Sequence, residues 1–228
     1  MRCGLYGKLP TKRDFIALNA PRDFLAVWEP WIQSAMAASR ESLGDTWIPA
    51  FLTAPIWRFW LGADLCETTV VGAFMPSLDG IGRYFPLTLF ACADESNAMP
   101  PPEIDPQDDW FAAAEHFLLS ILDDPISFEE TQSALDDLRL PASRHVDRRP
   151  DEPAGVFGNS IAKVGQRALP ETFAAMRLTD HAAIYSAATF WWTMGGEGYE
   201  PMALGGRRMP SPYLFSAMLS GRFESGCA

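Results

Sequence analysis

The chain has 228 residues, of which 48% are hydrophobic and 21% are charged, and its net charge is −11. This composition is typical of a globular protein with a sizeable core and excludes wholesale disorder. The acidic balance counts against nucleic-acid binding, because such a surface would repel a phosphate backbone.

The sequence shows no sign of membrane insertion or secretion. No stretch approaches the roughly 20 apolar residues that a membrane span needs. The start, MRCGLYGKLPTKRDF, lacks the apolar run of a secretory signal. The cysteines lie far apart and form no CxxC pair, which disfavours a disulfide framework or a zinc knuckle. We therefore expect a cytoplasmic protein with reduced thiols and no metal or cofactor.

The first part of the chain predicts strands around one helix. Residues 3–10 are expected to begin with a short strand, and apolar residues from Phe24 to Ala35 follow the spacing of one helix face. Pro30 predicts a kink in this helix or a start near it, and Gly44 is expected to end it. PIWRFWL, TTVVGAFM and YFPLTLFACA predict three strands, and Pro86 favours an edge position or a bulge in the third.

The middle of the chain is acidic and helical. Between Asp94 and Leu138 lie 13 of the 29 acidic residues and no Lys or Arg. Apolar residues over 110–122 predict an amphipathic helix, and Ser127 with Glu130 has the capping-box spacing of a second one. Solvated helix faces alone favour such carboxylates. The functional alternative is an acidic face that attracts a basic partner.

The last third predicts a polar loop over 140–155, a strand over 156–165 and a short helix over 171–178. AAIYSAATFWWTMGG predicts a buried helix or strand, and SPYLFSAMLSGRF a closing helix. The order of elements predicts a single α/β domain over residues 1–228. We expect a three-layer α/β/α sandwich with a mixed or largely antiparallel sheet and an acidic helical insert at about 94–138.

Motifs for catalysis are weak. Ser160-x-x-Lys163 has the spacing of a Ser–Lys pair, but the S-D-N and K-T-G motifs that accompany it in β-lactamases do not occur. His116, His145 and His181 have no metal-ligand spacing. The sequence also has no P-loop, dinucleotide-binding loop or G-x-S-x-G elbow. We therefore expect no enzymatic activity.

The segment MPSLDGIGRYFPLTLF, residues 75–90, places a polar corner between apolar runs. The candidate members of a polar cluster around this corner are Lys8, Asp14, Arg58, Ser77, Asp79 and Arg83. Arginines pair well with carboxylates, so these residues predict a buried ion network that joins the early strands. The alternative is a cleft that binds a ligand or a partner protein.

The eight tryptophans are a large number for this length. Most are expected in the core, where aromatic side chains dominate packing. In a strand, Trp57 and Trp60 lie on opposite faces, and so do Trp191 and Trp192. Some of these rings are therefore candidates for an exposed protein-binding patch, and Trp57 is a candidate binding residue.

Several motifs in the same order carry a family resemblance. They are GLYGKLPTKRDFI, W-x-x-W-I, APIWRFWL, MPSLDGIGRYFPLTL and FWWTMGG. This series resembles the type VI secretion-associated TagF/ImpM family, densely over residues 3–92 and more thinly to about 222. The sequence departs from the family pattern at Arg13, where a glycine is usual, which puts the local turn in question.

The resemblance implies a three-layer α/β/α fold and a non-enzymatic, cytoplasmic accessory of type VI secretion. Members of the family look like post-translational repressors that bind a forkhead-associated protein, which otherwise promotes assembly. Two other functions stay open at this point. One is a hydrolase or ligand-binding enzyme that uses Lys8, Asp14, Ser77, Asp79 and Arg83. The other is a structural subunit of the secretion assembly. The sequence leaves the oligomeric state open.

Overall fold

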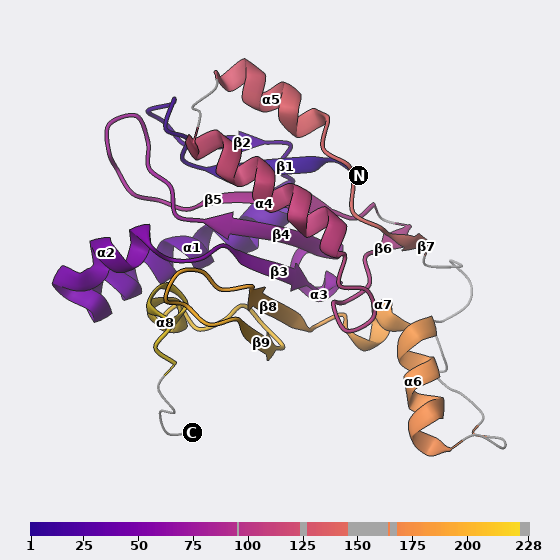
Figure 1. The fold of residues 1–228 in the computed structure, drawn as a ribbon. Coiled ribbons are helices and arrows are strands. Elements are labelled where there is room, and N and C mark those ends of the chain that lie inside the picture. Colours follow the sequence, from indigo (N-terminus) through magenta and orange to yellow (C-terminus); the bar gives the residue numbers. More distant parts are fainter. Residues whose placement is uncertain (95, 124–126, 146–163, 165–167, 224–228) are drawn as a thin grey trace.

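The protein folds around a seven-stranded sheet with helices on both faces (Figure 1). The computed structural model describes residues 1–94, 96–123, 127–145, 164 and 168–223. The strand order is β2-β1-β5-β4-β3-β8-β9, and every pairing is antiparallel. The strands are β1 (Cys3–Gly7), β2 (Ile16–Leu18), β3 (Trp57–Leu61), β4 (Val70–Met75), β5 (Leu87–Cys92), β8 (Thr189–Thr193) and β9 (Met202–Gly206). A separate small sheet pairs β6 (Asn97–Ala98) with β7 (Arg144–His145).

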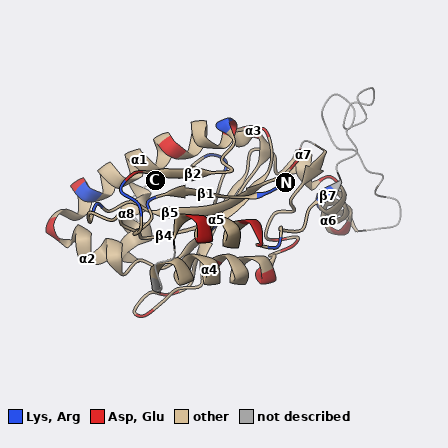
Figure 2. Ribbon diagram, turned by 90° about the horizontal axis from the view of Figure 1, so that it is seen from above, with Lys and Arg blue, Asp and Glu red and all other residues tan. Residues whose placement is uncertain are grey.

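Helices cover both faces of the sheet (Figure 1). The helices are α1 (Arg22–Leu43), α2 (Trp47–Leu52), α3 (Ala63–Cys66), α4 (Asp108–Asp123), α5 (Phe128–Asp136), α6 (Leu169–Thr179), α7 (His181–Ile184) and α8 (Leu214–Ser220), with a 3-10 turn η1 (Gly44–Thr46). Helix α6 projects beyond one end of the sheet (Figure 1). Seen from above, α1 and α4 lie on opposite sides of the sheet (Figure 2). The predicted three-layer α/β/α fold with a largely antiparallel sheet is confirmed.

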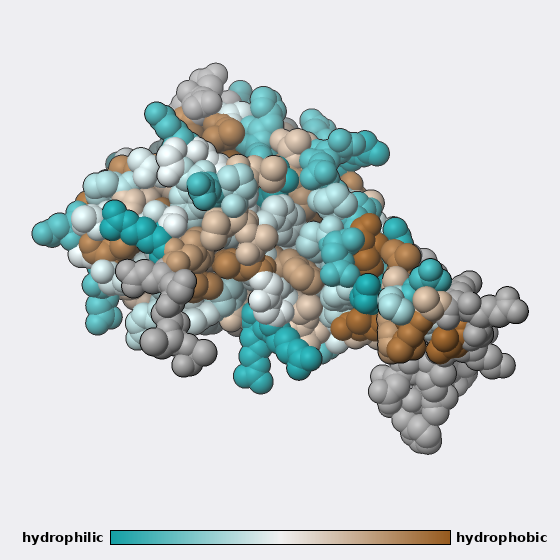
Figure 3. All heavy atoms as spheres, turned by 60° about the horizontal axis from the view of Figure 1, so that its bottom comes forward, coloured by the Kyte–Doolittle hydropathy of each residue, from teal (hydrophilic) through white to brown (hydrophobic). Residues whose placement is uncertain are grey.

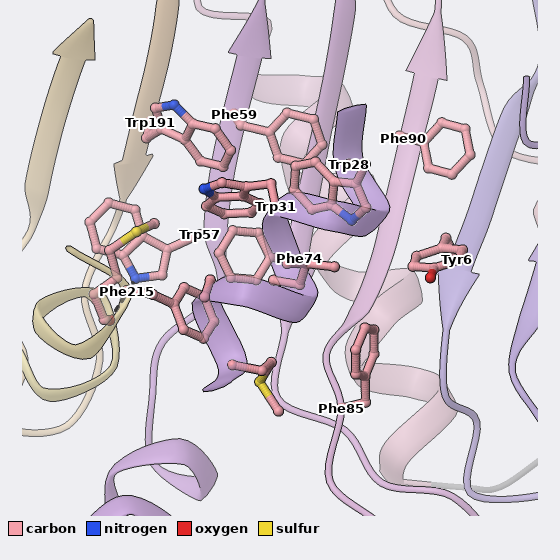
Figure 4. Close-up of a cluster of buried hydrophobic side chains, with 14 of the residues drawn as sticks. Tyr6, Trp28, Trp31, Trp57, Phe59, Phe74, Phe85, Phe90, Trp191 and Phe215 are labelled. Atoms are coloured by element: carbon pink, nitrogen blue, oxygen red, sulfur yellow. Dashed lines mark hydrogen bonds between the residues drawn. The ribbon is translucent and has the colours of Figure 1, made fainter. Parts of the chain in front are cut away.

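The α1 face of the sheet carries an aromatic core (Figure 4). Trp28 is fully buried, and its ring centroid lies 4.5 Å from that of Phe59 and 5.9 Å from that of Trp191. Trp31 and Trp57 also bury their rings and donate their indole N–H groups to backbone carbonyls of the C-terminal segment. Each pair of aromatic rings in contact stabilises the fold by about 0.5–1.5 kcal/mol beyond the burial of its surface.

The α4 face is packed by Trp60, by apolar residues of β1, β4 and β5, and by aromatic and aliphatic residues of α4. The alternation of β3 explains the division, because Trp57 and Phe59 point to the α1 face whereas Arg58 and Trp60 point to the α4 face. Trp192 lies on this side too, with its ring centroid 4.9 Å from that of Phe111. Seven tryptophans are buried and Trp192 is partly buried, so the tryptophans provide no exposed patch.

Most predicted elements are confirmed, with two corrections. Helix α1 begins at Arg22 and continues past the exposed Pro30, so it does not start near this proline. Pro86 was expected at an edge or a bulge, but β5 lies in the interior of the sheet and begins one residue after it. The strand predicted over 156–165 and the Ser160–Lys163 motif lie outside the described residues, except for Val164.

The capping box predicted from spacing is present at the start of α5. The Ser127 side chain accepts from the Glu130 backbone at 3.1 Å, and the Glu130 carboxylate accepts from the Ser127 backbone at 2.8 Å. These bonds lower the pKa of the Glu130 carboxyl. Among the described residues, no helix has both the length and the apolar character needed to cross a bilayer.

Candidate functional site

Three of the predicted charged residues meet at one end of the sheet. Lys8 follows β1, and its Nζ lies 2.7 Å from Oδ2 of Asp79, in the loop between β4 and β5. Arg83 Nε lies 2.6 Å from the same oxygen. The other carboxylate oxygen accepts from the backbone N–H groups of Ile81 and Arg83 at 3.1 and 2.9 Å. Asp79 is fully enclosed, and we call this arrangement, Lys8–Asp79–Arg83, the charged joint.

Further hydrogen bonds fasten the same loop to the chain after β1. The Ser77 hydroxyl donates to the Lys8 carbonyl at 2.8 Å, and the Gly80 N–H donates to the Lys12 carbonyl at 2.8 Å. Arg83 also donates to the Arg13 carbonyl. The loop between β4 and β5 is therefore held against the segment between β1 and β2 by backbone and side-chain bonds together.

The position of Arg13 explains how the chain tolerates its departure from the family pattern. Arg13 is not one of the residues with a positive φ, so its backbone does not require glycine. Its side chain is exposed and its carbonyl accepts from Arg83. The departure therefore leaves the turn intact.

The surroundings of Asp79 keep its side chain ionised. Burial alone would raise the pKa of this carboxyl, but hydrogen bonds from Lys8, from the backbone and side chain of Arg83 and from the Ile81 backbone hold its pKa well below the usual range. A carboxylate with this many donors has no free lone pair directed at solvent. Lys8 and Ser77 are also buried.

The other predicted members do not join this network. Arg58 was expected to share it, but β3 directs the side chain to the α4 face, where Nε donates to Glu115 at 2.6 Å and Nη1 lies 3.9 Å from Asp108. Asp14 is exposed and makes no ion pair with any described residue. Trp57 is buried and its indole N–H is bound to the Met218 carbonyl, so it presents nothing to a partner.

Sequence reasoning missed Glu115 as the partner of Arg58. The signal that was available is the apolar spacing of α4, which places Glu115 one residue after buried Ala114 and therefore at the border of the buried stripe. Arg58 also makes a cation–π contact with α4, because its guanidinium lies 5.2 Å from the centre of the Phe111 ring. Arg58 thus fastens α4 to the sheet.

The start of α4 opens on an acidic surface. A pocket of about 420 Å³ is lined by Asp105, Pro106, Gln107, Asp108, Asp109, Trp110, Arg139, Leu140 and Ala142. The Asp108 side chain is 78% exposed and Asp109 is exposed. Acidic residues appear along α4 and α5 in the view from above (Figure 2). Among the described residues, no cluster of three His, Cys, Asp or Glu is placed to hold a metal ion.

Comparison with known proteins identifies the family. Residues 4–138 match the TagF N-terminal domain, described as type VI secretion system-associated. The chain belongs to the TagF family. The matched TagF region contains both the charged joint and the acidic helices α4 and α5.

A solved structure supports the same assignment over nearly the whole chain. PA0076 from Pseudomonas aeruginosa PAO1 is similar with a TM-score of 0.80 and 29% sequence identity, covering 99% of this chain and 97% of its own. A comparison with curated proteins finds no match. The resemblance indicated by the sequence motifs is therefore confirmed, and the α/β/α fold is shared beyond the TagF N-terminal match.

Proposed function

We propose that this TagF-family chain is a non-enzymatic, cytoplasmic regulator of type VI secretion. It represses assembly by binding a forkhead-associated protein that promotes it. The observation that carries the proposal is the match of residues 4–138 to a type VI secretion-associated domain. The role as a repressor extends what the sequence motifs imply for the family.

The acidic surface at the start of α4 is the docking face in this proposal. Asp108 and Asp109 stand at an exposed helix N-terminus beside a pocket wide enough for a side chain of the partner. Clustered carboxylates raise the encounter rate with a basic surface and select against acidic ones. The partner is therefore expected to present Lys or Arg at this contact.

The internal bonding of the charged joint supports a regulator over the alternative enzyme. A hydrolase that used this cluster would need a nucleophile open to substrate. Ser77 is buried with its hydroxyl donated to the Lys8 carbonyl, and Asp79 is enclosed by its donors. Asp14, the remaining carboxylate of the proposed enzyme site, lies outside the network.

The experiment measures binding of the purified forkhead-associated protein to the full chain by calorimetry at two salt concentrations. The variant Asp108→Asn/Asp109→Lys changes the docking face and leaves Glu115 in place to neutralise Arg58. We expect its affinity to fall by about tenfold or more at low salt, with a smaller loss at high salt. The matched control, Glu41→Lys/Asp45→Asn, makes the same charge change at exposed residues of α1 and η1 and is expected to bind normally.

Two results would contradict the proposal at different levels. If the unmodified chain does not bind the forkhead-associated protein, the repressor function is wrong. If it binds and the Asp108→Asn/Asp109→Lys variant binds equally well, the function stands but the docking face is elsewhere. A structural subunit would instead be recovered in fixed ratio with the assembled secretion apparatus.

A further inference from the structure

The last strand of the sheet has an open edge. β9 pairs with β8 in the register Thr193↔Met202 to Thr189↔Gly206, and it ends the strand order. Within the described part of the chain, no strand pairs with its other side. In an antiparallel ladder, alternate residues of an edge strand direct their N–H and C=O groups outward. β9 therefore offers backbone donors and acceptors to a further strand.

β9 lacks most of the features that protect natural edge strands. Proteins usually guard an edge with charged residues, bulges or very short strands. The sequence MALGG has no charge, and Ala203, Gly205 and Gly206 are exposed. A Cβ atom at Gly205 would approach only the Phe190 ring, at 3.8 Å, so no other chain segment crowds this position. Only Pro201, just before the strand, limits pairing at one end.

The face of the molecule that lies at the bottom of Figure 1 is partly apolar, as the uncharged sequence of β9 leads us to expect. In Figure 3, pale and brown atoms occupy the middle of the face, and hydrophilic atoms project around them. On the side of β9 that faces α1, Met202 and Leu204 pack against the aromatic core. The strand is therefore fixed in place by its own core while its outer edge stays available.

The charges at the two ends of β9 are opposite in sign. Glu200 precedes the strand, and Arg207 and Arg208 follow it. All three are exposed, and none forms an ion pair with a described residue. When a second β9 strand pairs with the first in the antiparallel direction, the negative end of each strand lies beside the positive end of the other.

We infer that the β9 edge is an interface for a second copy of this chain, with the two β9 strands antiparallel about Leu204. In this register Met202 lies opposite Gly206 of the other copy, and Ala203 lies opposite Gly205. Glu200 of each copy comes within reach of Arg207 and Arg208 of the other. The two sheets then continue as one across the two-fold axis.

The contact is small, and this sets the kind of association. Five residues on each side provide a few backbone hydrogen bonds and two exposed ion pairs, well below the area of a permanent dimer. We expect a reversible dimer that forms over roughly tens to hundreds of micromolar protein. Salt weakens it, because the flanking charges are solvent-exposed.

The test is sedimentation equilibrium of the full chain between about 10 and 500 µM, at low and high salt. Glu200→Arg alone and Arg207→Glu/Arg208→Glu alone each place like charges together at the interface. Each is expected to weaken self-association by about tenfold or more. An equimolar mixture of the two restores opposite charges at both ends and is expected to form a heterodimer.

Two further variants complete the test. Ala203→Lys adds a guarding charge at an exposed position of the edge and is expected to give a monomer. Glu41→Arg, an exposed change on α1, is expected to leave the dimer intact. Circular dichroism confirms that each variant is folded.

A monomeric unmodified chain at the highest concentration would overturn the inference. So would a dimer that the β9 variants leave unchanged, which would place the contact on another face, such as the exposed side of α6. Failure of the mixed variants to associate would exclude the antiparallel charge pairing.

Discussion

Lys8 and Arg58 are two buried cations with different tasks. Their exposed fractions are similar, 5% and 6%, and both belong to the motifs that carried the family resemblance. Lys8 lies at one end of the sheet and shares Asp79 with Arg83. This contact holds the loop between β4 and β5 against the segment that follows β1. Arg58 projects from the middle of β3 to Glu115, which fastens the helical layer to the sheet.

The difference shows how surroundings decide the role of an ion pair. At the charged joint every oxygen of the carboxylate is engaged within the protein. At Arg58 the partner Glu115 is partly exposed, with 23% of its side chain open to solvent, and Asp108 beyond it is mostly exposed. The Lys8–Asp79 pair is therefore enclosed within the fold, whereas the Arg58–Glu115 pair borders the acidic surface that we propose as the docking face.

The largest expected effect comes from removing the cation of the enclosed pair. Lys8→Met retains the apolar stem of the side chain and deletes its ammonium. We expect the free energy of unfolding to fall by about 3 kcal/mol, because a buried charge loses one of its partners. Urea unfolding measures this change. A loss below about 1 kcal/mol would mean that Arg83 and the backbone bonds suffice to stabilise the joint.

Acid should weaken the joint through Asp79. A carboxyl with a depressed folded pKa adds stability above its unfolded pKa of about 3.9, and this contribution is lost as the pH falls further toward the folded value. Carboxyl NMR of the labelled chain should therefore show Asp79 still ionised at about pH 3. Titration near the ordinary value would contradict the bonding described for this residue.

Loss of the Glu115 charge should lower the free energy of unfolding by an intermediate amount, and loss of the Asp108 charge by a small one. Glu115→Gln keeps the shape of the side chain but removes its charge, and we expect a loss of about 1.5 kcal/mol in the free energy of unfolding. Asp108→Asn is the matched control, since Asp108 is exposed and 3.9 Å from Arg58, and its expected cost is below about 0.5 kcal/mol. Equal costs would show that the acidic surface is coupled to the fold.

The sequence predicted the core better than the ionic contacts. Apolar spacing from Phe24 to Ala35 located α1, and the aromatic and β-branched residues of PIWRFWL located β3. The two-residue period of a strand places Arg58 on the face of Trp60, but no local pattern reveals which helix covers that face. The pairing with Glu115 joins residues 57 positions apart and depends on the packing of α4.

β9 could not be predicted for a related reason. MALGG has two glycines and no β-branched residue, so its strand propensity is low. It becomes a strand because β8 supplies its hydrogen-bonding partner and the core accommodates Met202 and Leu204. In the charged joint, by contrast, Ser77, Asp79 and Arg83 lie within one short segment, and the two predicted members that do not join it are Asp14 and Arg58.

The most direct test of the account measures folding and partner binding on one preparation of Arg83→Ala. The Arg83 side chain is 56% exposed, so its removal should lower the free energy of unfolding by only about 1 kcal/mol. The account predicts this loss together with an affinity for the forkhead-associated protein within about twofold of normal. Unchanged stability with an affinity reduced by more than about tenfold would show that the loop itself recognises the partner.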